Sequence, residues 1–308
     1  MLNLDIWRAQ FQDWLELRFT SKDTRNNCLS GIAPFFEYVA FLRLNSWTEA
    51  DRDVLEEYRA RIFAMKHTHT GQPIKVGTRV SKLVALKSFF KFLTSQGFLM
   101  ANPAAMLEFP KQEKPLPAVL SEPEMLRLLE IPDLTSFFGV RDRTLLELLY
   151  GTALRNGELC SLTLDQVDLA QHLIRLQKGK GNKGRVVPLG QEAQVWLEHY
   201  LENVRPFVLR NPACHFLFTD RWGHKGLSRG VLSQIVRGLG QKAEIGKTVT
   251  PHTLRHSCAT HMLRRGAGLR QIQKLLGHSQ LSSTEHYTRV EVSDLRKLLA
   301  RCHPREKS

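Results

Sequence analysis

Several features that would define other classes of protein are absent from this 308-residue sequence. It has no run of about 18 apolar residues, so no membrane span is expected. It has no Gly-rich Walker loop, no H-E-x-x-H motif and no Cys/His cluster with metal spacing, so neither a nucleotide nor a metal cofactor is expected. The five cysteines include no C-x-x-C pair, and their odd number argues against a disulfide framework. This use of cysteine is typical of proteins in a reducing cytoplasm. The N-terminal residues do not resemble a signal peptide, which agrees with that expectation.

Acidic side chains are also missing from one long stretch. From Tyr58 to Leu107 there is no Asp or Glu. The same stretch holds eight basic residues, namely Arg59, Arg61, Lys66, Lys75, Arg79, Lys82, Lys87 and Lys91. Such a field attracts phosphate groups, and the whole chain shares the bias, with 44 Lys and Arg against 30 Asp and Glu. The expected partner is therefore a nucleic acid, and an ordinary solvated basic surface is the alternative.

The length suggests two domains. Residues 1–110 carry apolar side chains at helical spacing, for example Phe11, Trp14 and Leu15, and are predicted to be all-helical. Residues 111–120 are predicted to be an extended, proline-containing linker. Residues 121–308 form the second predicted domain, which starts with a capping box of Ser121 and Glu124. The predicted fold class is mainly α: an all-helical N-terminal domain and a mostly helical C-terminal domain with a small antiparallel sheet.

Particular elements can also be predicted. Helices are expected at 49–65, 78–94, 141–150, 191–204 and 227–243. Strands are expected at 173–177 and 185–189, joined by a glycine-rich hairpin loop, with a further short strand at 215–218.

One segment, residues 250–290, carries the most chemistry. A helix is predicted to begin at residues 250 and 251, and it places His252 and Arg255 on one face. A second helix ends at Gly277, His278 follows, and Tyr287 comes soon after. Imidazoles, a guanidinium and a phenol could together hold a phosphodiester and attack it. A His-x-x-Arg pair by itself is weak evidence, because such pairs often lie on solvated helix faces.

The combination of HTLRHSCATH, LLGHS and Tyr287 resembles the tyrosine recombinase (phage integrase) family, most of all its Xer-like members. The resemblance extends over nearly the whole chain and is strongest from about residue 120 onward. It implies that Arg155, in GTALRNGEL, is the first active-site arginine. The nearby carboxylate of Glu158 is expected to orient the arginines and not to react. Many relatives have Gly where this chain has Ala153.

The resemblance also implies that Lys180, the first lysine of the GKGNK run, is the catalytic lysine. On sequence alone, Lys178 and Lys183 remain competitors. The implied roles are a nucleophile (Tyr287), two arginines that clamp the phosphate, a lysine that protonates the leaving oxygen, and histidines that hold the phosphate or relay a proton. The predicted catalytic set is Arg155, Lys180, His252, Arg255, His278 and Tyr287.

The implied function is a site-specific DNA recombinase that works through a 3′-phosphotyrosyl link and a four-way junction, without a cofactor. Its implied partners are double-stranded DNA with a specific site, clasped by the basic N-terminal domain, and other protomers in a tetramer. A C-terminal helix with the apolar stripe of Val292, Leu295, Leu298 and Leu299 would dock on a neighbouring protomer and so link the protomers, and packing on its own domain is the alternative. Two alternatives stay open: a type IB topoisomerase-like strand relaxer and a catalytically inactive DNA-binding relative.

Overall fold

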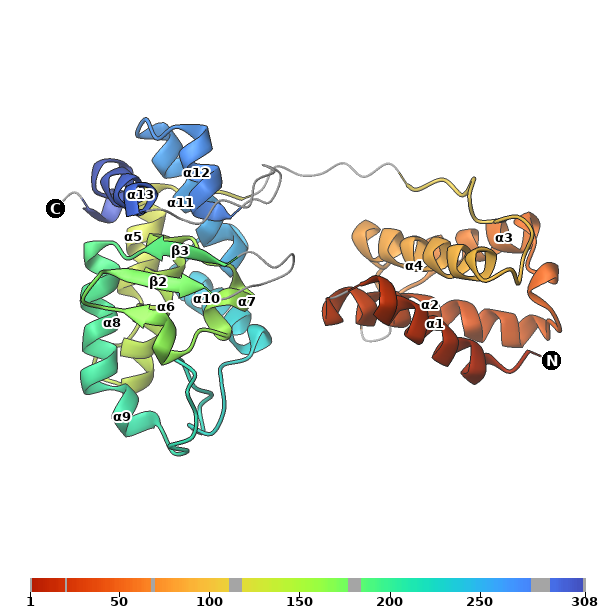
Figure 1. Ribbon diagram of the computed structural model, residues 1–308, viewed down its shortest axis with the longest axis horizontal. Coiled ribbons are helices and arrows are strands. Elements are labelled where there is room, and N and C mark those ends of the chain that lie inside the picture. Colours follow the sequence, from red (N-terminus) through yellow and green to blue (C-terminus); the bar gives the residue numbers. More distant parts are fainter. Residues whose placement is uncertain are drawn as a thin grey trace. The chain divides into compact units, whose positions relative to one another are not determined.

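The computed structural model describes residues 2–19, 21–67, 70–110, 118–176, 184–277 and 289–306, with the backbone alone for 289–292. The chain divides into two compact units, Met1–Pro115 and Leu116–Ser308 (Figure 1). Helices make up most of both units, and the second unit contains one small antiparallel sheet. This confirms the fold class predicted from the sequence.

In the described part of the first unit, four α-helices pack around an aromatic core. They are α1 (Leu4–Arg18), α2 (Lys22–Leu42), α3 (Arg52–Ala64) and α4 (Val76–Ser95). Phe11, Phe35 and Phe89 are completely buried and meet other rings mostly edge-on. The helix expected at 49–65 begins later, at Arg52, because the Asp51 side chain accepts hydrogen bonds from the first free backbone N–H groups of α3.

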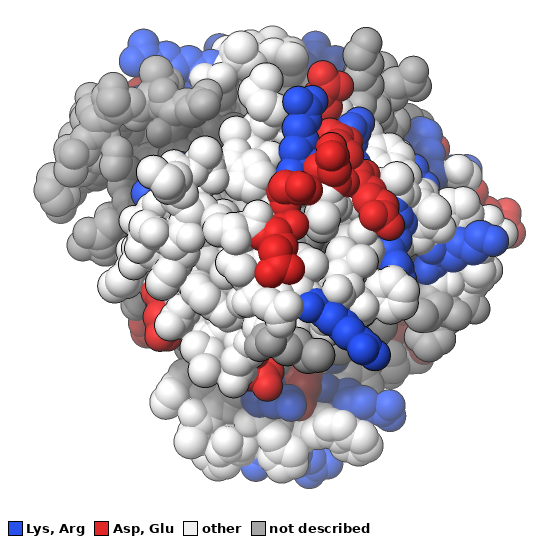
Figure 2. Space-filling model, turned by 90° about the vertical axis from the view of Figure 1, so that its right-hand side faces the viewer, with Lys and Arg blue, Asp and Glu red and all other residues white. Residues whose placement is uncertain are grey.

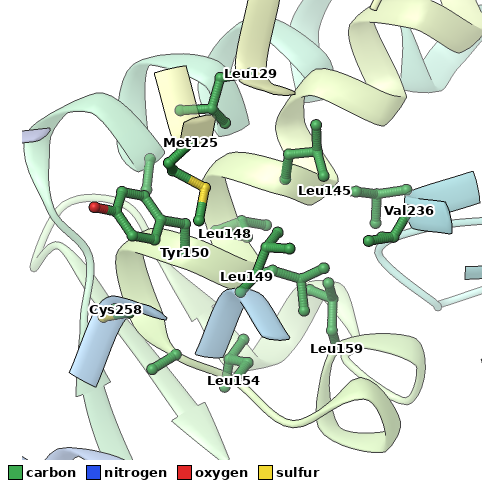
Figure 3. Close-up of a cluster of buried hydrophobic side chains, with 14 of the residues drawn as sticks. Met125, Leu129, Leu145, Leu148, Leu149, Tyr150, Leu154, Leu159, Val236 and Cys258 are labelled. Atoms are coloured by element: carbon green, nitrogen blue, oxygen red, sulfur yellow. The ribbon is translucent and has the colours of Figure 1, made fainter. Parts of the chain in front are cut away.

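The second unit is built around α6, which is buried on most of its circumference. Leu145, Leu148 and Leu149 of α6 lie between helices α5, α10 and α11 (Figure 3). The predicted capping box is present, since Ser121 Oγ accepts from Glu124 N and a Glu124 oxygen accepts from Ser121 N. The helices are α5 (Glu122–Glu130), α6 (Phe137–Thr152), α7 (Asn156–Cys160), α8 (Gln191–Asn203), α9 (Arg205–Val208), α10 (Arg229–Lys242), α11 (Pro251–Arg264), α12 (Leu269–Leu276) and α13 (Arg289–Cys302).

The sheet has the order β1-β2-β3, with both pairs antiparallel. Its strands are β1 (Val167–Asp168), β2 (Leu173–Leu176) and β3 (Arg185–Pro188). The β2–β3 pair is the predicted hairpin, closed at its described end by Leu176 opposite Arg185. The loop 177–183 lies outside the described residues. The sequence did not predict β1, because two residues are too few to show an alternating pattern.

The strand expected at 215–218 is wrong, since only an isolated bridge joins Thr163 to Phe216. The side chain of Arg205 supplies hydrogen bonds that a neighbouring strand would otherwise provide. The buried guanidinium of Arg205 donates to the carbonyl oxygens of Cys214, Phe216 and Leu217. These carbonyls therefore have their hydrogen bonds without a sheet.

The C-terminal helix α13 packs within its own unit. Leu295, Leu298 and Leu299 are buried in the core of the second unit, and α13 contacts α11, α12 and β3. The side chain of Val292 lies outside the described residues. While α13 is packed in this way, the apolar side chains that were predicted to link protomers are buried against their own chain. Among the described helices, none combines the length and the apolar character needed to cross a membrane.

Candidate active site

Arg155 lies at the sharp junction between α6 and α7. Ala153 ends α6 in the left-handed conformation, with φ of 50°. Arg155 then returns to extended backbone and caps α7, and its N–H donates to Glu158 Oε2 at 2.7 Å. Its guanidinium donates to Glu158 Oε1 at 2.8 Å and to the carbonyl oxygen of Gly277 at 3.0 Å. The side chain remains 46% exposed, so a ligand can reach it.

Arg255 projects from α11 into the interior and is only 7% exposed. One Nη donates to the carbonyl oxygen of Ala153 and the other to that of Leu276, the latter at 2.5 Å. Burial, followed by the positive charge of Arg155, lowers the pKa of Arg255 to about 10. The guanidinium therefore stays protonated at neutral pH, and it ties the end of α6 to the end of α12.

The two predicted arginines converge at the C-terminus of α12. The last carbonyls of this helix, on Leu276 and Gly277, accept from Arg255 and Arg155 respectively. Gly277 has φ of +63°, as expected for the residue that ends the helix. Cations are favoured at this end of a helix, where carbonyl groups lack partners. His278 is the next residue in the chain, although it lies outside the described residues.

Glu158 is held by a second arginine that sequence reasoning missed. Arg185, the first residue of β3, donates from both Nη atoms to the two oxygens of Glu158, at 2.5 and 2.8 Å. Burial tends to raise the pKa of Glu158. The hydrogen bonds and charge of Arg185, and then the hydrogen bonds of Arg155, outweigh burial and hold that pKa at about 2. The one indication in the sequence was a basic residue at the foot of the hairpin that carries Lys180.

The remaining predicted residues divide into two groups. His252 is exposed in the first turn of α11, the helix that carries Arg255, and Thr250 caps that helix as predicted. Lys180, His278 and Tyr287 lie outside the described residues. The structure thus brings together Arg155, Glu158 and Arg255 from segments about one hundred residues apart in sequence.

His261, on the same helix, has a structural role. Its ring is buried, with Nδ1 at 2.9 Å from Tyr150 Oη and Nε2 at 2.8 Å from the carbonyl oxygen of Leu120. Both ring nitrogens are therefore occupied inside the core.

Comparison with known proteins identifies the family. Residues 118–293 match the phage integrase family. The chain is 38% identical over 298 residues to tyrosine recombinase XerD of Staphylococcus epidermidis, covering 96% of this chain and 98% of that protein. The chain is a tyrosine recombinase of the phage integrase family.

Solved structures of other recombinases share the fold of this tyrosine recombinase. XerH bound to its difH substrate, in a pre-cleavage complex, has a TM-score of 0.65 at 21% identity over 89% of each chain. The lambda integrase tetramer bound to a Holliday junction has a TM-score of 0.66 at 17% identity, over 92% of this chain and 81% of that one. Family membership confirms the site-specific recombinase predicted from the sequence. The comparisons give no support to the topoisomerase-like or inactive alternatives.

In the first unit of the tyrosine recombinase, the stretch from Tyr58 to Leu107 has acidic neighbours in the folded structure, although it contains no Asp or Glu itself. Arg59 forms an ion pair with Glu56 at 2.7 Å. Burial lowers the pKa of Lys82, and the charge of Glu37 from α2 opposes that shift. Acidic side chains gather beside basic ones on the face drawn in Figure 2. The local field is therefore weaker than the sequence alone implied.

The other bases of this stretch differ in exposure. Lys87 donates to the carbonyl oxygen of Ala105 at 3.1 Å. Arg61 and Arg79 lie over aromatic rings, in cation–π contacts. The most exposed lysines of the predicted set are Lys66, Lys75 and Lys91. These three are the better candidates for phosphate contact.

Proposed function

We propose that this tyrosine recombinase cuts DNA by attack of the Tyr287 hydroxyl on a phosphodiester. A bond forms between the phenolic oxygen and phosphorus while the bond from phosphorus to the 5′-oxygen breaks. The products are a 3′-phosphotyrosyl link and a 5′-hydroxyl, and Lys180 supplies the proton that the leaving 5′-oxygen takes up. The observation that carries the proposal is the convergence of Arg155 and Arg255 beside the residue that precedes His278.

The two arginines would bind the non-bridging oxygens of the phosphate. A guanidinium has five N–H donors, and the described hydrogen bonds of Arg155 and of Arg255 use two each. Both side chains are already fixed by these bonds, so little reorganisation is needed when charge develops on the phosphate. A preorganised donor of this kind is typically worth about 10²–10³ in rate. Their positive charge would also favour the ionised phenol of Tyr287 and lower the pKa of Lys180.

The histidines complete the proposed site. His252 is exposed at the start of α11, so it is available to hold the phosphate or relay a proton. His278, the residue after Gly277 in the sequence, would share this role. Glu158 orients the arginines and takes no part in bond formation. No cofactor is required, because the energy of the broken ester bond is kept in the phosphotyrosyl link.

Rejoining would exchange partners between two duplexes. The 5′-hydroxyl of one duplex attacks the phosphotyrosyl link of the other, and two rounds of exchange pass through a four-way junction. This requires two copies of a specific site and several protomers, for which we propose a tetramer. The fold shared with the lambda integrase tetramer bound to a Holliday junction supports this arrangement. The enzyme would act in the cytoplasm, where DNA lies in the bacterium that holds its XerD relative.

Protomers would be linked by exchange of α13. The same surface of α11, α12 and β3 that holds Leu295, Leu298 and Leu299 within the chain would receive these side chains from a neighbour. An exchanged helix buries the same apolar area in either place, so the exchange costs little free energy beyond that of bringing the protomers together.

The nucleophile can be tested with DNA that the protein itself selects. The wild-type protein would be used to recover a bound duplex from a random-sequence library, and that duplex, nicked near the cut, would be the substrate. Wild type should form a covalent adduct that releases a 5′-hydroxyl strand, whereas Tyr287→Phe should bind equally well and form none. An adduct with the Phe variant would refute the assignment. Exchange between two duplexes, and not mere relaxation of supercoils, identifies recombination.

A further inference from the structure

We propose that Arg185 is a positioning residue for DNA cleavage, which acts by fixing Glu158 and through it the guanidinium of Arg155. The inference rests on the proposed role of Arg155 in binding the scissile phosphate. Arg185 would not touch the phosphate itself. It would hold in place the group that does.

The hydrogen bonds form a chain from the interior to the solvent. Glu158 Oε1 accepts from Arg185 at 2.5 Å and from the Arg155 guanidinium at 2.8 Å. Its Oε2 accepts from Arg185 at 2.8 Å and from the Arg155 backbone N–H at 2.7 Å. The exposed fraction rises along the chain, from 11% for the Arg185 side chain to 21% for Glu158 and 46% for Arg155. The inner arginine is thus the anchor and the outer one faces the ligand.

The fork of Arg185 prevents the carboxylate from turning. Two parallel N–H···O bonds define both the plane and the direction of the Glu158 carboxylate. With only Arg155 as partner, that carboxylate could rotate and take the exposed guanidinium with it. Glu158 belongs to a short helix that Arg155 itself caps, so the local backbone gives little further restraint.

Gly277 supports both arginines at once. A Cβ at this position would lie only 2.9 Å from Arg185 Cδ and 3.0 Å from its Cζ. The carbonyl oxygen of Gly277 meanwhile accepts from Arg155. Arg185 is therefore packed against the same residue to which Arg155 is hydrogen-bonded. It is also the first residue of β3, the strand that follows the segment containing Lys180 in the sequence.

The electrostatic consequence provides a distinctive readout. Arg185 is the strongest influence that lowers the pKa of Glu158 against the effect of burial. Without Arg185, that pKa should rise. Glu158 would then take up a proton, and release Arg155, at a higher pH than in the wild type. Loss of a merely structural contact would lower activity equally at all pH values.

The test compares Arg185→Met with Arg175→Met, which removes the other arginine–carboxylate pair of the same sheet, Arg175 with Asp168. Single-turnover cleavage of the nicked duplex selected by wild type would be measured from pH 5.5 to 8. Arg185→Met should cleave about 10–100-fold more slowly, by analogy with the loss seen when a partner that orients a metal ligand is removed. Its affinity for the duplex should change less than about twofold, and its deficit should deepen as pH falls. Arg175→Met should resemble wild type throughout.

Two further variants separate positioning from folding. In a Glu158→Gln background, Arg185→Met should add little, because both act through one chain of bonds. Arg185→Lys keeps the charge without the fork and should restore only part of the rate. The proposal is overturned if Arg185→Met cleaves like the Arg175 control, if its deficit is independent of pH, if the two losses multiply, or if Lys restores the full rate. Failure of wild type to form any adduct would instead refute the proposed function.

Discussion

Glu147 offers a test of how the C-terminal segment is held to the second unit. Its side chain is only 1% exposed and lies between two arginines. Arg143, on the same helix, donates to its Oε1 at 2.9 Å, and Arg305, beyond α13, donates to the same oxygen at 2.8 Å. Arg305 also reaches Glu192 at 2.9 Å. This carboxylate therefore fixes the residues that follow α13 to α6.

Glu147→Gln keeps the shape of the side chain and removes its charge. Breaking a buried ion pair typically costs about 3–5 kcal/mol. Gln can still accept a hydrogen bond and Glu192 still partly neutralises Arg305, so we expect about 3 kcal/mol, at the lower end of that range. For a unit of this size, that loss corresponds to a fall in melting temperature of about 6–12 °C.

Differential scanning calorimetry of the full chain is the appropriate measurement. The two compact units should unfold as separate transitions, so the first unit serves as an internal control. Asp168→Asn is the matched external control, since it breaks the exposed pair with Arg175 and should hardly move either transition. Equal effects of the two substitutions would refute the argument that burial of Glu147 makes its ion pairs important for stability.

Two other predictions concern DNA contacts and pH. Lys75→Ala with Lys91→Ala should reduce the slope of log affinity against log salt by about 2, because each exposed lysine would neutralise one phosphate. An unchanged slope would place these lysines away from DNA. Burial, opposed by the Tyr150 carbonyl and reinforced by Arg305, His261 and Arg265, lowers the pKa of His303 to about 4. This folded-state pKa lies below the unfolded value of about 6.5, so the unfolded chain takes up a proton at His303 more readily than the folded one. The free energy of unfolding is therefore undiminished above pH ~6.5 and falls by about 3 kcal/mol as the pH drops towards ~4. The melting temperature of the second transition should follow this loss. His303→Gln should make the dependence less steep, leaving the contributions of His261, whose pKa is also lowered, and of carboxyls with shifted pKa values such as Glu158.

The outcome for α13 shows what periodicity can predict. Leu295, Leu298 and Leu299 at helical spacing indicated a short amphipathic helix, and that helix exists with those side chains buried. A stripe of apolar residues shows that a helix must pack, but it does not identify the surface on which it packs. The structure of the single chain places it on its own unit, and exchange with a neighbouring protomer stays a proposal.

The sequence by itself determined features that depend on neighbouring residues. Ser121 and Thr250 each satisfy free N–H groups within the next turn, so the local sequence is enough to mark where α5 and α11 begin. Gly266 and Gly277 end their helices because both take a positive φ that other residues resist. The motif around Arg155 and Arg255 likewise identified the family without knowledge of any contact.

Only the tertiary structure decided which charges meet. Arg185 and Glu158 are 27 residues apart, and a local pattern cannot show that β3 brings one to the other. The acids that offset the basic stretch of the first unit likewise come partly from α2, a separate helix. A strand was predicted at 215–218 because the side chains of that segment favour one. In the structure, carbonyl oxygens of this segment instead accept hydrogen bonds from the guanidinium of Arg205. The physical reason is the same in each case: a charged or hydrogen-bonding group is satisfied by the nearest partner in space, and sequence separation does not limit that choice.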